Sequence, residues 1–126
     1  MKKIINTEKA PAAIGPYSQG VQLSNLTFLS GQLGIDPKTG DFPSATDVEA
    51  QCEQVFRNIE ALLGEAGLTF ADVLKCTVFL ADMADFAKVN AIYGKYFDEP
   101  YPARSAFAVK GLPKGGLVEI EVIAGK

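Results

Sequence analysis

The strongest constraint on the fold is a stretch, residues 48–66, in which apolar side chains recur every three or four positions. That spacing is the period of a helix with one buried face, so we predict a helix of about 19 residues packed on a sheet. Gly67 follows, and glycine commonly ends a helix. Before the stretch, Thr46 and Glu49 have the spacing of a capping box, in which both side chains satisfy free backbone donors. The recurring apolar positions are Val48, Cys52, Val55, Phe56, Ile59, Leu62, Leu63 and Ala66.

Strand-like apolar runs lie on both sides of this helix, separated by turns rich in glycine, proline, serine or asparagine. A second amphipathic helix is predicted at roughly residues 83–97, with Asp82 as its cap. The order β-β-β-α-β-α-β-β suits an α+β fold, in which one mixed sheet carries both helices on one face. The predicted strands are residues 3–5, 21–23, 26–33, 73–80, 104–110 and 117–125, and the last two are expected to form a hairpin.

The length of the chain indicates one domain, residues 1–126, large enough to bury a core of its own. If both helices cover one face of the sheet, the other face is bare, and oligomerisation is the simplest way to cover it. No apolar run approaches the roughly 20 residues of a membrane span. The start, residues 1–6, turns polar too soon for a signal peptide, so we expect a cytoplasmic protein without a membrane partner.

Charge and residue types disfavour several classes of function. The formal net charge is -3 and the basic residues are scattered, whereas nucleic-acid binders usually show a basic stripe. The chain has no histidine, which removes histidine metal sites, Ser-His triads and Cys-His dyads. Cys52 and Cys76 lie in apolar stretches and are predicted to be buried free thiols. No cofactor motif is visible, so we expect no cofactor, no metal and no nucleic-acid partner.

Arg104 opens an apolar strand-like run, and on a strand its side chain shares a face with Ala106 and Ala108. The small neighbours leave room for a ligand or another chain. A guanidinium binds a carboxylate through two parallel hydrogen bonds, which suits a substrate anchor. The alternative interpretation is a strand-end arginine paired with a carboxylate of the chain itself.

Three other polar residues have two open interpretations each. Glu119 could orient or deprotonate a water or be a solvent-facing strand residue, and Glu121 shares its face. Asn90 lies within the apolar stripe of the second helix, where it could bond a neighbouring backbone group or point into a pocket or a seam between subunits. Tyr17 could be a packed loop aromatic or a site residue. An arginine anchor with a water-handling carboxylate suits hydrolysis of a small 2-keto-acid derivative.

Several separated motifs resemble the YjgF/RidA family. Residues 102–105, Pro-Ala-Arg-Ser, are followed by an apolar strand, a Gly/Pro loop and the final strand Val-Glu-Ile-Glu-Val at 118–122. Residues 10–20 resemble the family's opening loop, 30–32 the end of its third strand, and 85–90 its second helix. The resemblance implies a chorismate-mutase-like fold and a homotrimer with its sites in the clefts between subunits.

The resemblance also implies an activity, the hydrolysis of 2-imino acids such as 2-iminopropanoate and 2-iminobutanoate to 2-keto acids and ammonia. These imines are tautomers of enamines released by PLP enzymes. In this role Arg104 holds the carboxylate, backbone groups near Ser30 and Gly31 fix the imine end, and Glu119 positions the water. The alternative is a non-enzymatic trimer, either a sensor of 2-keto acids or other small carboxylates or a chaperone-like protein. The positions matching the family's site are Tyr17, Ser30, Gly31, Asn90, Arg104 and Glu119.

Ala106 departs from many family members, which have cysteine at this position, two residues after the arginine. The departure excludes a thiol role there. The backbone carbonyl of Ala106 is still available to hold the attacking water, so we include it among the predicted substrate-binding residues.

Overall fold

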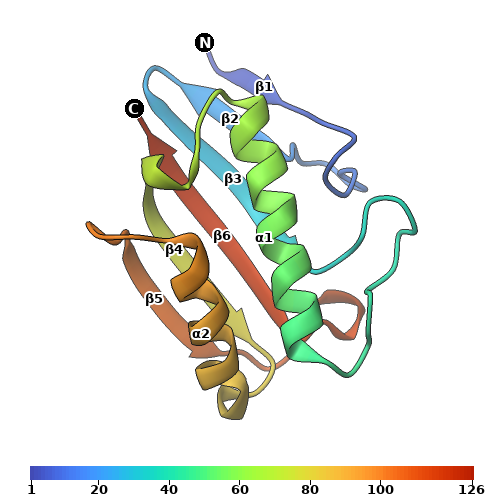
Figure 1. Ribbon diagram of the computed structural model, residues 1–126. Helices are drawn as coiled ribbons and strands as arrows, with labels where there is room; N and C mark the ends of the chain where they lie inside the picture. The colour runs from blue at the N-terminus through green and yellow to red at the C-terminus, as the bar shows by residue number, and fades with distance from the viewer.

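The computed structural model describes the whole chain, residues 1–126, as one six-stranded sheet with two helices on one face (Figure 1). The strand order is β1-β2-β3-β6-β4-β5, and every neighbouring pair is antiparallel except β4 with β5. The mixed sheet and the placement of both helices are as predicted. The strands are β1 Lys3–Ile5, β2 Gly20–Leu23, β3 Leu26–Leu33, β4 Val73–Leu80, β5 Ala103–Ala108 and β6 Val118–Gly125, and the helices are α1 Val48–Glu65 and α2 Phe86–Tyr96.

Helix α1 buries the predicted apolar stripe against the sheet. Every stripe residue from Val48 to Leu63 is buried, and Ala66 is partly buried. Gly67 has a φ of 77°, the left-handed conformation in which glycine ends a helix without strain. The predicted capping box is wrong, because Asp47 and not Thr46 is the N-cap. The Asp47 carboxylate accepts a hydrogen bond from the Glu49 amide at 3.0 Å.

The predicted hairpin between the last two strands is also wrong. Strand β6 lies between β3 and β4 and is antiparallel to both, whereas β5 lies at the sheet edge and pairs in parallel with β4. Parallel strands need a long crossover, and α2 supplies it between β4 and β5. The following loop then takes the chain past β4 to the centre of the sheet (Figure 1).

Asp82 is a cap, as predicted, but of a 3-10 turn and not of α2 itself: its carboxylate accepts from the Ala84 amide at 2.9 Å, and the helix begins later than predicted, at Phe86. A short 3-10 turn, Met83–Asp85, precedes α2. Cys52 and Cys76 are buried free thiols, as predicted, and burial raises the pKa of Cys52 to about 12. None of the helices has the length and apolar character needed to cross a membrane.

The sheet face opposite the helices carries large apolar side chains that remain exposed in a single chain. Phe28 alternates with the buried Thr27 and Leu29, and it is 42% exposed. Phe107 lies edge-on to Phe79, with 5.4 Å between ring centroids, and is 44% exposed. This bare face is the one expected from the order of elements, and the oligomer that would cover it stays a prediction.

Candidate functional site

The two residues predicted to do the chemistry lie on opposite faces of the sheet. Arg104 is paired with Cys76, whose fully buried side chain faces the helices. Glu119 is paired with Phe79, one of the residues on the bare face. Since side chains of neighbouring strands at one register position share a face, Arg104 points to the helix side and Glu119 away from it. One chain therefore does not bring the two together.

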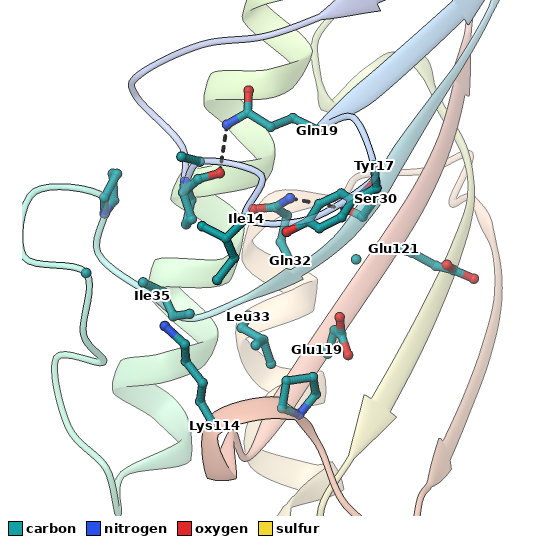
Figure 2. A pocket seen from close by; sticks show the side chains of 16 residues that line it. Ile14, Tyr17, Gln19, Ser30, Gln32, Leu33, Ile35, Lys114, Glu119 and Glu121 are labelled. Carbon is teal, nitrogen blue, oxygen red and sulfur yellow. Dashed lines mark hydrogen bonds between the residues drawn. The ribbon is translucent and has the colours of Figure 1, made fainter.

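One cavity, which we call the carboxylate pocket, has a volume of about 770 Å³. It brings together four predicted site residues, Tyr17, Ser30, Gly31 and Glu119, as Figure 2 shows for the labelled side chains. Glu121 lines it as well. The other lining residues include Ile14, Gln19, Gln32, Leu33, Ile35 and Lys114.

A bulge in β3 shapes one wall of the carboxylate pocket. The pairing of β3 with β6 shifts between Leu29 and Gln32, so Ser30 and Gly31 together oppose one residue of β6. The Ser30 hydroxyl donates to the Ser18 carbonyl at 2.6 Å, which fixes the bulge to the opening loop. A Cβ atom at Gly31 would lie 2.5 Å from the Glu119 carboxylate. Because glycine has no Cβ atom, the Glu119 carboxylate can occupy this space.

The buried Gln19 side chain holds the loop that carries Tyr17. Its Oε1 accepts from the Thr7 amide at 2.7 Å, and its Nε2 donates to the Pro11 carbonyl at 2.7 Å and the Thr7 carbonyl at 3.0 Å. These bonds tie the two ends of the loop to the start of β2. Tyr17 itself is 53% exposed and lines the pocket, so it is not a packed loop aromatic.

Electrostatics make Glu119 a weaker acid than an ordinary glutamate. Burial, and in second place the negative charge of Glu121, raise the pKa of the Glu119 carboxyl. No ion pair neutralises either carboxylate, since the one ion pair of the chain joins Lys95 to Glu53. A carboxylate with a raised pKa accepts a proton more readily, which suits a group that deprotonates or orients water.

Arg104 lines the second cavity, which we call the arginine pocket, of about 410 Å³. Its Nη1 donates to Asn90 Oδ1 at 2.7 Å, and its guanidinium lies over the rings of Tyr93 and Phe86. No carboxylate pairs with it, so the interpretation as a strand-end ion pair is wrong. Its positive charge is therefore not neutralised within the chain.

Asn90 and Ala106 lie near Arg104 but differ from expectation. Asn90 lines the arginine pocket, in agreement with its interpretation as a pocket residue, but it is exposed instead of buried and uses its amide oxygen on Arg104 instead of a backbone group. The neighbouring strand β5 supplies the partner, which helix periodicity alone does not reveal. Ala106 lies on the same face as Arg104 and is partly buried, and it lines neither of these two cavities.

A family comparison matches almost the whole chain. The sequence model of the family described as Endoribonuclease L-PSP covers residues 7–126. The chain belongs to this family, the YjgF/RidA family.

Named relatives of this YjgF/RidA chain are close in sequence. Reactive Intermediate Deaminase A, chloroplastic, from Arabidopsis thaliana is 52% identical over 98% of this chain, which spans 65% of that protein. The 2-iminobutanoate/2-iminopropanoate deaminase of Capra hircus is 50% identical over 98% of this chain and 90% of its own length. The crystal structure of E. coli TdcF with bound serine has a TM-score of 0.92 and 46% identity over 98% of both chains.

Sequence reasoning on this YjgF/RidA chain missed several pocket residues. Tyr93 belongs to the apolar stripe of the second predicted helix and no role is predicted for Tyr101, yet both line the arginine pocket. Tyr93 follows Asn90 by three positions, so helical spacing could have indicated that they share a face. Lys114 lines the carboxylate pocket from the loop before β6, and no pattern in the sequence pointed to it.

Proposed function

We propose that the protein is a hydrolytic deaminase that converts 2-imino acids to 2-keto acids and ammonia without a metal or cofactor. The observation that carries the proposal is the Arg104 guanidinium, fixed by neutral partners while its charge stays free for a carboxylate. A relative at 50% identity is named 2-iminobutanoate/2-iminopropanoate deaminase, and one at 52% identity is named Reactive Intermediate Deaminase A. We expect 2-iminopropanoate and 2-iminobutanoate, from enamines released by PLP enzymes, as substrates in the cytoplasm.

The separation of Arg104 from Glu119 supports a site built from two chains. The arginine pocket faces the helix side and the carboxylate pocket opens on the other, which favours a neighbouring copy as the source of the missing half. The exposed apolar face with Phe28 and Phe107 gives such copies a surface to bury. We propose a homotrimer of the chorismate-mutase-like type, with each site between two subunits.

In this composite site each group has one task. Arg104 binds the substrate carboxylate in a forked geometry, and backbone groups of the Ser30-Gly31 bulge hold the imine nitrogen. Glu119 accepts a proton from water as the water oxygen bonds to C2, and the carbonyl of Ala106 helps to hold that water. The C=N electron pair moves to nitrogen, which is protonated, and the resulting carbinolamine releases ammonia to leave the keto acid. Such imines hydrolyse unaided, so acid-base help of about 10²–10⁴-fold suffices.

The test of the activity generates imine in situ with a PLP enzyme acting on serine or threonine. We expect added protein to speed both imine loss and ammonia release. A protein that binds 2-oxobutanoate but never speeds imine loss would be a sensor, since a sensor needs the same arginine and no positioned water. A chaperone-like role predicts neither effect.

The description of the family as an endoribonuclease raises a second class of substrate. The carboxylate pocket opposes it, because Glu119 and Glu121 outweigh the single cation Lys114 and leave the lining with a net negative charge that would repel a phosphate backbone. We therefore keep the expectation of no nucleic-acid partner.

A mixture of two inactive variants should recover activity if sites form between chains. An Arg104→Ala chain keeps Glu119, and a Glu119→Gln chain keeps Arg104, so some interfaces in a mixed trimer combine both intact groups. Random mixing restores about a quarter of the wild-type sites. The measurement is ammonia release after co-expression with two affinity tags, with each variant alone as control.

The same material gives the oligomeric state by sedimentation at micromolar concentration. We expect about three times the 13.4 kDa of one chain. A monomer, or verified mixed trimers that stay inactive, would remove the intersubunit site.

A further inference from the structure

We infer that Tyr93 is a positioning residue that holds the Arg104 guanidinium through the face of its aromatic ring. The inference rests on the proposed function, because it assigns to Arg104 the binding of a substrate carboxylate. It adds that the geometry of this anchor is set from helix α2, and not by β5 alone.

The contacts around the guanidinium are all with neutral groups. Arg104 Cζ lies 4.7 Å from the Tyr93 ring centroid and 5.4 Å from that of Phe86, both within the range of cation–π attraction. Asn90 Oδ1 accepts from Nη1 at 2.7 Å. Phe86, Asn90 and Tyr93 recur at the i, i+4, i+7 spacing of one helix face. One face of α2 therefore holds the cation without neutralising it.

The Tyr93 ring is itself held in place by the core. It is only 6% exposed, and its centroid lies 4.6 Å from that of Phe97 and 6.1 Å from that of Phe56. A ring packed in this way cannot swing aside when a carboxylate arrives. The guanidinium therefore meets the substrate on a rigid support, although Arg104 itself is exposed.

The hydroxyl of Tyr93 takes no part in holding the arginine. It is buried and unpaired, and the thiol of Cys76 is the polar group beside it. Burial, and in second place that thiol, raise the pKa of Tyr93, so the ring remains a neutral phenol. The active part of the residue is the ring face, which distinguishes positioning from hydrogen-bond catalysis.

The first test compares Tyr93→Leu, which removes the ring, with Tyr93→Phe, which removes only the hydroxyl. We expect Tyr93→Leu to raise KM about three- to tenfold with little change in kcat, since the anchor holds ground and transition states alike. Tyr93→Phe keeps the ring face, so its KM should rise much less than that of Tyr93→Leu. The matched control is Tyr96→Leu on the same helix, whose ring stacks on Phe56 at 4.5 Å and makes no contact with Arg104. It should cost stability but leave KM unchanged.

The second test varies only the electron density of the ring. Phenylalanine analogues with one, two or three ring fluorines at position 93 should raise KM stepwise, because each fluorine weakens the negative ring face. The dissociation constant of 2-oxobutanoate should rise in the same order. That binding series tests the positioning role even if the protein releases no ammonia, so the two failures can be told apart.

A third readout needs no ligand. In NMR spectra the Arg104 side-chain protons should be displaced upfield by the ring current in wild type and Tyr93→Phe, and return towards ordinary values in Tyr93→Leu. An undisplaced wild-type signal, or a flat fluorine series, would overturn the positioning role of Tyr93.

Discussion

Replacing Arg104 with lysine should lower kcat/KM for 2-iminobutanoate by about 100-fold or more, because two charge-assisted hydrogen bonds to the substrate carboxylate become one. Lysine keeps the positive charge but lacks the rigid fork. Its ammonium group also has no planar face to lie over the Tyr93 ring, as the guanidinium does. The protein should remain folded, because Arg104 is exposed and buries no core volume. The measurement is ammonia release, with circular dichroism to confirm the fold.

The matched control is Arg57→Lys, the same change at the other arginine of the chain. Arg57 is exposed on α1 and lines neither pocket, so its replacement should leave kcat/KM unchanged. A folded Arg104→Lys protein with near-normal rates would show that the substrate carboxylate is bound elsewhere.

Replacing Glu119 with glutamine should lower kcat about 10²–10⁴-fold and leave the binding of 2-oxobutanoate almost intact. The two side chains are nearly isosteric, and the change leaves Arg104 untouched. An interaction that acts mainly in the transition state affects kcat and not ground-state binding. Steady-state kinetics and calorimetric titration of the keto acid measure the two effects separately.

Glu121→Gln is the matched control, since both carboxylates line the carboxylate pocket. It should retain most activity but change its pH dependence. The Glu121 charge helps to raise the pKa of Glu119, so its removal lowers that pKa and Glu119 stays ionised in more acidic solution. The acidic limb of the rate profile should therefore move to lower pH. Full activity in both variants would mean that neither carboxylate handles the water.

The elements of this fold could be predicted because each has a period of its own. The stripe from Val48 to Leu63 and the runs at 26–33 and 73–80 appear in the structure at almost the predicted bounds. The pairing of the strands could not be predicted in the same way. Alternation shows which side chains of one strand share a face, but not which other strand lies beside it. Likewise Thr46 and Asp47 are both good caps, and the local backbone, not spacing, decided between them.

The structure groups four of the predicted site residues in the carboxylate pocket and two in the arginine pocket, a division that the sequence did not predict. Strand alternation placed Arg104 and Ala106 on one face, as the structure has them. The position of Glu119 on the opposite face follows from the register of β6 with β4, a long-range pairing that no local pattern encodes. Tyr93 packs in the core and also lines the arginine pocket. Its place in an apolar stripe indicates the core position but not the pocket.

The central place of β6 has a consequence for synthesis on the ribosome. The strand that joins β3 to β4 is the last of the sheet to be made, so until it emerges β3 and β4 have no strand between them. The nascent chain then exposes the unpaired edges of β3 and β4, together with apolar side chains that pack against α1 in the complete fold. Such a state is prone to aggregation. Because Val118–Gly125 pairs with both β3 and β4, we expect a chain cut short before this strand to leave the sheet in two separate parts.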